Sequence, residues 1–227
     1  MVNIFDDLMD RMMVWIDDLL GFAKTEAELL ELLANVFERA REVGLKFNPT
    51  KCTIFARELV WCGKIYSGNG IRHDPERIAA LTSMPEPKTV KDLQQLMWAV
   101  GWMRTTIPDY PYIIEPLQEV VGRANEELKR TKSTFEKLRA VLVEHVQLAY
   151  PKKDFQTCLF TDASEFAWSA VVTQIPMEDI ELPISEQRHE PLAFHGKRFD
   201  NTQLRWPIIE KEAAAIVQAT TRGDFLL

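Results

Sequence analysis

The sequence has few of the residues that form disulfide bonds or bind structural metal ions. Its three cysteines (Cys52, Cys62 and Cys158) lie far apart and match no zinc or disulfide spacing, and its four histidines are equally scattered. No signal-peptide pattern opens the chain. The first apolar stretch is interrupted by Asp17 and Asp18, too early for a membrane span. We therefore expect an intracellular, reduced protein with no structural metal and no membrane partner.

Low-complexity tracts and short repeats are absent too, and 227 residues with 46% hydrophobic and 27% charged side chains suit one or two globular domains. A net charge of −7 disfavours a nucleic-acid partner at first, because such a partner needs its phosphates neutralised. The charge is uneven, however: residues 1–37 carry a net −6, residues 38–72 a net +4, and residues 122–139 six bases against three acids. An acidic centre beside basic segments is typical of metal-dependent chemistry on nucleic acid, although solvated helices produce charge patches more often.

Apolar periodicity and turn residues predict a mixture of helices and strands. Residues 1–10 are expected to be the end of a helix, and further helices are expected over about 25–44, from Asp74-Pro75, over 89–105, over 133–145 and over 207–221. Strands are expected over 12–16 and 19–23 as a hairpin, over 52–55 and 58–66, and over 157–161, 167–173 and 191–195. Prolines break the stretch from 108 to 116, and residues 122–132 have the composition of a linker.

The acids between the first two expected strands, Asp17 and Asp18, suggest metal chemistry. Phosphoryl transfer with two divalent ions needs several carboxylates around ions about 4 Å apart. Magnesium accepts one or two carboxylates together with substrate phosphates. The same dipeptide recurs at Asp6-Asp7, so the pair by itself is more often an ordinary surface feature.

Five motifs follow one another along the chain: residues 15–20 (WIDDLL), 44–52 (GLKFNPTKC), 60–65 with 70–71, 74–89 with 107–108, and 161–164 (TDAS) with 209–212 (IEKE). In this order they resemble the reverse transcriptase and ribonuclease H region of gypsy-type long-terminal-repeat retrotransposon polyproteins. The matching parts are the Tyr-x-Asp-Asp hairpin, the Gly-Leu-x-x-Asn-x-x-Lys-Cys segment, the primer grip, the entry to the thumb and connection, and the start of the ribonuclease H.

The resemblance implies an α+β chain, with a partial reverse-transcriptase palm and thumb followed by a partial RNase H-like mixed sheet. We expect residues 1–72 to form the C-terminal part of the palm with the primer grip, 73–150 the thumb and connection, and 151–227 the N-terminal part of the RNase H-like domain. The implied parent activity is RNA-directed DNA synthesis with cleavage of hybrid RNA. Both reactions would use Mg²⁺ on an RNA/DNA primer–template or hybrid duplex.

The resemblance also assigns roles by position. Asp17 and Asp18 match the second carboxylate cluster of the palm, and Lys51 matches a lysine thought to protonate the leaving pyrophosphate. The alternatives are a surface turn for the two acids and an ordinary surface lysine.

The remaining roles concern nucleic-acid contact and the nuclease. Asp162 and Glu212 match the first two nuclease carboxylates, with Glu210 as a competitor, and their alternatives are a strand-end turn residue and a solvated helix position. The primer grip, for which the alternative is a plain core strand, matches Trp61, Cys62, Gly63 and Lys64.

Two departures from the family pattern affect activity. Sixteen residues precede Asp17, so an earlier palm aspartate lies outside this sequence, and fifteen follow Glu212, so the third nuclease aspartate does too, with Asp224 a poor substitute. Trp15 stands where the family has tyrosine or phenylalanine. We expect this chain alone to be inactive and to associate with the missing polyprotein parts. The alternatives are a retained, non-catalytic nucleic-acid-binding or interaction module, and a piece of a decaying element.

Overall fold

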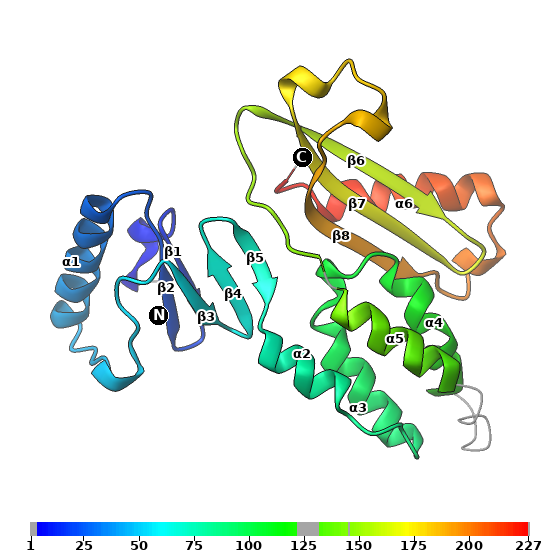
Figure 1. Cartoon of the computed structure of the whole chain (residues 1–227), viewed down its shortest axis with the longest axis horizontal. Helices are drawn as coiled ribbons and strands as arrows, with labels where there is room; N and C mark the ends of the chain where they lie inside the picture. The colour runs from blue at the N-terminus through cyan, green and yellow to red at the C-terminus, as the bar shows by residue number, and fades with distance from the viewer. Residues whose placement is uncertain (1–3, 122–131, 145, 227) are drawn as a thin grey trace. The chain divides into compact units, whose positions relative to one another are not determined.

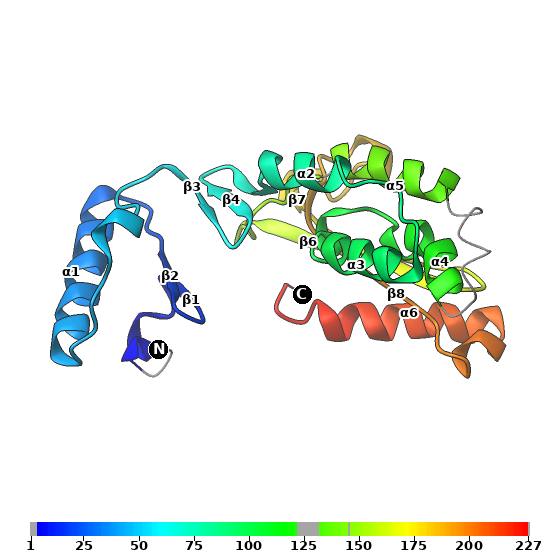
Figure 2. The same ribbon diagram turned by 90° about the horizontal axis from the view of Figure 1, so that it is seen from below.

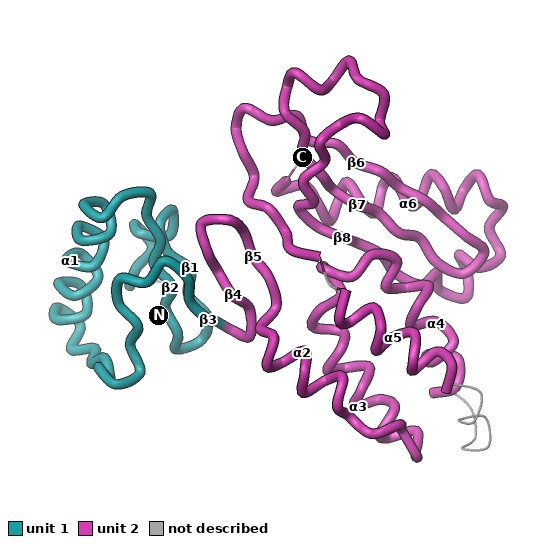
Figure 3. Tube along the Cα trace, in the orientation of Figure 1, with its two compact units in different colours: residues 1–61 teal, residues 62–227 magenta. Residues whose placement is uncertain are grey.

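The computed structural model describes residues 4–121, 132–144 and 146–226, which fold into helices and sheets as expected for an α+β chain. The chain divides into two compact units, residues 1–61 and residues 62–227 (Figure 3). The finer division into palm, thumb with connection, and RNase H-like parts stays a prediction. None of the described helices is long and apolar enough to cross a membrane.

The first unit consists of a short hairpin covered by one long helix. Strands β1 (Met12–Trp15) and β2 (Asp18–Gly21) are antiparallel, and α1 (Glu26–Glu42) follows them (Figure 1). The helix begins where predicted, because the Thr25 hydroxyl accepts a hydrogen bond from the backbone N–H of Glu28 at 3.2 Å. Its buried side chains Leu32 and Val36 pack against residues that come before the hairpin and from β1, namely Phe5, Leu8 and Met12.

Three local predictions for this unit are wrong. The described part of residues 1–10 holds only a 3-10 turn over Asp6–Leu8 rather than the end of an α-helix. Residues 52–55 do not form a strand, and Phe55 there has a positive φ of 66°. The strand expected over 58–66 is interrupted: β3 (Glu58–Trp61) ends at Cys62 and Gly63, whose φ values of 51° and 73° are incompatible with a continuous strand. Positive φ at these positions follows from local turn chemistry that apolar periodicity does not report.

The second unit begins with the hairpin of β4 (Lys64–Ser67) and β5 (Gly70–His73) and continues into a helical bundle. The helices are α2 (Pro75–Thr82), α3 (Val90–Gly101), α4 (Tyr110–Val121) and α5 (Lys132–Val143). As predicted, α2 starts after an Asp74 cap and α3 after a complete capping box at Thr89. Their facing side chains form the largest core of the protein, which includes Leu93, Leu96, Val100, Ile114, Leu117, Phe135 and Leu138.

The stretch expected to be broken by prolines is instead mostly α4. Pro111 lies in the first turn, where its missing N–H would have had no partner inside the helix. Pro116 lies within the helix, and the apolar face formed by Ile114, Leu117 and Val120 is buried in the core. Burial of that face stabilises the helix by more than the hydrogen bond lost at Pro116 costs. This stabilisation comes from tertiary packing, which the local sequence does not show.

The chain ends in a three-stranded antiparallel sheet with one helix on it. The strands β6 (Phe155–Ala163), β7 (Ala167–Pro176) and β8 (Glu190–Arg198) pair in that order, and α6 (Ile208–Arg222) covers one face (Figure 2). Ala163 and Trp168 lie on that face and pack with Ala215 and Ala219. Helix α4 lies against the other face, where a Cβ added to Gly196 would come within 2.4 Å of Pro111 Cγ. Glycine at 196 therefore permits the close approach of α4.

Candidate functional site

The first candidate site is the tip of the β1–β2 hairpin. Trp15 pairs with Asp18, so the two residues of the turn are Ile16 and Asp17 rather than the predicted Asp17-Asp18. Ile16 has a positive φ of 55°, which is strained for a β-branched residue and is usually left to glycine. The hairpin itself is as expected, but one acid lies in the turn and the other begins β2.

All four residues of this tip face solvent. Trp15 is 50% exposed and Ile16 79%, and the carboxylates of Asp17 and Asp18 are exposed beside them. Two adjacent carboxylates next to an exposed aromatic ring can bind a divalent cation or the end of a polynucleotide that carries one. Strain at an exposed tip of this kind is typical of functional sites.

Lys51 lies in the same unit, on the segment after α1. It ends a 3-10 turn over Pro49–Lys51, which Asn48 starts by accepting hydrogen bonds at Oδ1 from the Thr50 N–H (3.1 Å) and hydroxyl (2.7 Å). Its side chain is exposed, and no ion pair of Lys51 is found in the described part of the chain. The lysine is therefore accessible to a phosphate ligand, as its predicted role requires.

Of the residues expected in the primer grip, Trp61 belongs to the first unit and Cys62, Gly63 and Lys64 belong to the second. The sequence suggests that Gly63 leaves room for a nucleic-acid backbone. In the structure that room holds Arg77, because a Cβ on Gly63 would lie 2.3 Å from Arg77 Nη1. Lys64 is half-buried, and burial lowers the pKa of its ammonium group. The approach of Arg77, which lies on α2, is a contact that no local pattern reveals.

The second candidate site starts from Asp162 on β6, directly opposite Ser169 on β7. Side chains alternate along a strand, and the neighbouring Ala163 packs under α6, so Asp162 lies on the opposite face of the sheet. There it lines a cavity of about 210 Å³ together with Asp109 and Ser169. Burial, and to a smaller extent the charge of Asp162, raise the pKa of the nearby Tyr112 hydroxyl.

Glu212 projects from α6 on the other side of that sheet. It is half-buried and follows Lys211, whose Nζ donates to the backbone oxygens of Glu165 (2.9 Å) and Leu204 (3.1 Å). The competitor Glu210 is exposed in the first turn of the helix. Asp162 therefore lies on the face of the sheet opposite α6, the helix that carries Glu212. Lys211 was not among the predicted site residues, although its spacing of four from Ala215 marks the buried stripe of α6.

Each of the two candidate sites offers two predicted carboxylate ligands for magnesium. In residues 4–121, 132–144 and 146–226, no group of three or more His, Cys, Asp or Glu side chains is placed to hold a metal ion. Asp17 and Asp18 still offer suitable carboxylate oxygens, since magnesium takes its other ligands from water and phosphate. Asp162 and Glu212 are likewise two carboxylates rather than three, and their role as magnesium ligands stays a prediction.

Titration with Mn²⁺ can test the first of these sites. We expect paramagnetic broadening of the backbone amide signals of residues 16–19, because the two carboxylates at the tip are adjacent and exposed. The double substitution Asp17→Asn, Asp18→Asn should abolish it. The matched control is Asp6→Asn with Asp7→Asn, since Asp7 already pairs with Arg39 at 2.8 Å. Broadening centred on Asp162 or Glu212 instead would contradict the assignment.

Two protein families match this chain. Residues 1–81 match the reverse transcriptase (RNA-dependent DNA polymerase) family, and residues 129–225 match the RNase H-like domain found in reverse transcriptase. The chain is 29% identical over 230 residues to the retrovirus-related Pol polyprotein from transposon 297 of Drosophila melanogaster, covering 97% of this chain and 20% of that protein. It is 24% identical over 208 residues to the transposon Tf2-3 polyprotein of Schizosaccharomyces pombe, covering 90% and 15%. The chain therefore spans about a fifth or less of these relatives.

Solved structures show the same fold. The foamy viral protease-reverse transcriptase in complex with RNA/DNA hybrid has a TM-score of 0.79 and 19% identity, covering 99% of this chain and 30% of that one. The same kind of protein in complex with dsDNA has a TM-score of 0.76 and 20% identity, covering 100% and 47%. The gypsy-type assignment is consistent with these matches. The chain belongs to the reverse transcriptase and RNase H region of retroelement Pol polyproteins.

Proposed function

We propose that the chain works as the later part of a reverse-transcriptase palm, the thumb and connection, and the first part of the RNase H-like domain. Its substrates would be an RNA/DNA primer–template and hybrid duplex. The observation that carries the proposal is the exposed Asp17–Asp18 pair at the tip of a two-residue hairpin, in the segment that matches the reverse transcriptase family.

The residues of the first unit would divide the work at the primer end. Asp17 and Asp18 would hold Mg²⁺, which when bound supplies charge stabilisation for the transferred phosphoryl group. The exposed Lys51 would give a proton to the departing pyrophosphate. Trp61 would contact the primer as part of the grip, together with Lys64 of the second unit, whose half-buried side chain is less accessible to a phosphate than Lys51.

We further propose that residues 1–227 alone neither extend a primer nor cut hybrid RNA. Two-metal transfer needs several convergent carboxylates, and no group of three or more side chains placed to hold a metal ion is found among the described residues. The purified chain, incubated with primer–template or labelled hybrid in Mg²⁺ or Mn²⁺, should show neither product. Extension lost in Asp18→Asn, or cleavage lost in Glu212→Gln, would overturn this expectation.

A second candidate function is a non-catalytic nucleic-acid-binding module. It is favoured by the basic run over residues 38–72, in which Lys46, Lys51 and Arg57 are exposed. The other basic run, 122–139, falls largely outside the described residues. A positively charged surface that neutralises phosphates can bind a duplex with no catalytic carboxylates at all.

Association with the rest of a polyprotein is also part of the proposal. The first unit exposes large apolar side chains, among them Leu30 on α1 and Ile54 and Val60 after it, each more than half exposed. In the proposed assembly another segment of the polyprotein would cover these side chains. Insolubility of the isolated chain would instead favour the alternative that the chain is a piece of a decaying element.

A further inference from the structure

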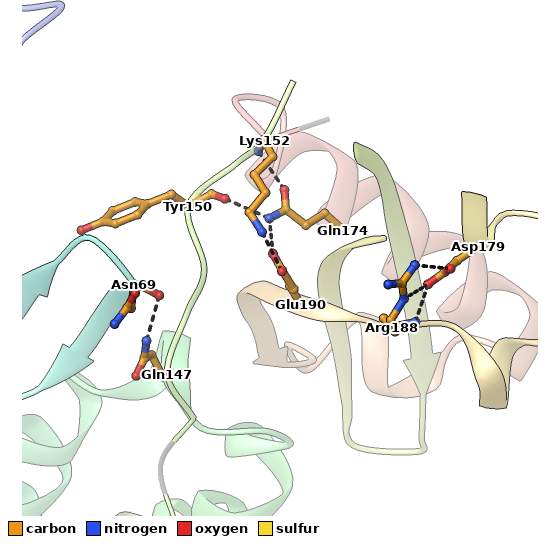
Figure 4. A network of polar contacts seen from close by, with 8 residues as sticks. All are labelled: Asn69, Gln147, Tyr150, Lys152, Gln174, Asp179, Arg188 and Glu190. Carbon is orange, nitrogen blue, oxygen red and sulfur yellow. Dashed lines mark hydrogen bonds and ion pairs between the residues drawn. The ribbon is translucent and has the colours of Figure 1, made fainter. Parts of the chain in front are cut away.

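One extended segment of the second unit bonds to two different sheets at once. This segment, residues 147–152, is called the strap below (Figure 4). On one side it pairs with β5: the N–H of Ile71 donates to the oxygen of Leu148 at 2.9 Å, and the N–H of Leu148 donates back at 2.9 Å. The Gln147 amide adds a hydrogen bond to the Asn69 oxygen at 2.9 Å. The strap therefore lies along the β4–β5 hairpin like a short additional strand.

On its other side the strap bonds to the sheet of β6, β7 and β8. The Ala149 N–H donates to the Pro191 oxygen at 2.8 Å. The side chain of Gln174, on β7 and 1% exposed, holds the next residues: its Nε2 donates to the Tyr150 oxygen and its Oε1 accepts from the Lys152 N–H, both at 2.9 Å. A single amide thus fixes two backbone groups of the strap.

An ion pair completes the attachment. Gln174 Nε2 also donates to Glu190 at 2.8 Å, and the Lys152 ammonium reaches the same carboxylate at 2.7 Å (Figure 4). Lys152, and to a smaller extent Gln174, hold the pKa of Glu190 below its usual value. The carboxylate is therefore charged and bonded at neutral pH, and it joins the start of β8 to the strap.

On the hairpin side the fit depends on Gly70. Its φ is +131°, and a Cβ added there would lie 2.2 Å from the backbone oxygen of Leu148. Only glycine allows the strap to come this close. Next to it, the hairpin tip and the start of β8 leave a cavity of about 470 Å³, lined by Gly68, Asn69, His189 and Glu190. Because side chains do not fill this space, hydrogen bonds through the strap carry much of the connection.

We propose that Gln174 is a positioning residue, which through the strap fixes the orientation of the β4–β5 hairpin relative to the β6–β8 sheet. A nucleic-acid duplex that touches the hairpin is then held in one register against the sheet that carries Asp162. The role of Gln174 in orienting the hairpin depends only on the structure, whereas the register of the duplex also rests on the proposed function.

The orientation can be measured with two spin labels on the full chain. Gly68→Cys suits the hairpin, because Gly68 is exposed and its Cβ would meet nothing within 4 Å, and Lys197→Cys suits β8, because Lys197 is exposed. The three native cysteines are replaced by serine. Gln174→Met keeps the side-chain length and removes the amide. We expect Gln174→Met to widen the interlabel distance distribution roughly twofold. The strap can then separate from the sheet without breaking hydrogen bonds to a Gln174 side-chain amide.

The matched control is Gln187→Met in the β7–β8 connection. Gln187 also donates to a backbone oxygen, that of Leu182 at 2.9 Å, but it does not touch the strap, so the distribution should stay narrow. If Gln174→Met loses the circular dichroism of the sheet, Gly70→Ala tests the strap from the hairpin side and should give the same widening. A distribution as narrow as in the unsubstituted chain, in either folded variant, overturns the proposal.

The register of a bound duplex needs a separate measurement. An iron chelate attached at Lys197→Cys should cut a bound RNA/DNA hybrid at one narrow position, and Gln174→Met should spread the cuts over several base pairs while the affinity is retained. Equally sharp cuts in both would overturn the register. If no hybrid binds, the proposed function and the register both fail, and the spin-label result alone decides the role of the strap.

Discussion

Raising the salt concentration from 50 to 200 mM is expected to weaken binding of this chain to an RNA/DNA hybrid by about 40-fold. Lys46, Lys51 and Arg57 are exposed and form no ion pair within the described ranges. If each neutralises one phosphate, counterion release gives a slope of about −2.7 in log affinity against log salt. Filter binding or fluorescence anisotropy at four or five salt concentrations would measure that slope.

The control uses bases of the same region that are already paired. Arg41 pairs with Glu38 at 3.8 Å, and Arg39 pairs with Asp7 and with Glu42. Arg41→Gln should leave the slope nearly unchanged, whereas changing Lys46, Lys51 and Arg57 together to glutamine should flatten it. If the triple variant keeps the full slope, the binding surface lies elsewhere on the chain. Equal effects of paired and unpaired bases would mean that net charge alone decides.

The sequence predicted well those elements whose signals are local. Thr25, Asp74 and Thr89 accept hydrogen bonds from backbone N–H groups two or three residues later, so the start of each helix is written in adjacent residues. The prolines of α4 misled the prediction because burial of Ile114 and Leu117 depends on α3 and α5, which are distant in sequence. The strand expected over 52–55 failed because a short apolar run does not by itself specify a partner.

The candidate sites divide in the same way. The hairpin with its two acids could be predicted, since both strands and the turn lie within ten residues. The surroundings of Gly63 could not be predicted, because the side chain of Arg77 occupies the space next to this glycine. Alternation along β6 indicates that Asp162 and Ala163 face opposite ways, but only the packing of α6 shows which of the two faces that helix covers. Gln174 carries no sequence signal at all, because its partners are backbone groups of a segment more than twenty residues away.

Replacing Phe135 with alanine is expected to lower the free energy of unfolding of the second unit by about 3–5 kcal/mol. The ring is 1% exposed in the largest core, and the Arg139 guanidinium lies 4.4 Å from its centroid, so the substitution leaves a cavity and removes a stacking surface. Urea unfolding followed by circular dichroism measures the loss. Lys137→Ala, on an exposed position of the same helix, should change stability by less than about 0.5 kcal/mol. Because α4 packs both on this bundle and on the sheet, the sheet should unfold with the bundle. A sheet that keeps its hydrogen-exchange protection after the bundle has opened would show that the two parts of this unit are stable separately.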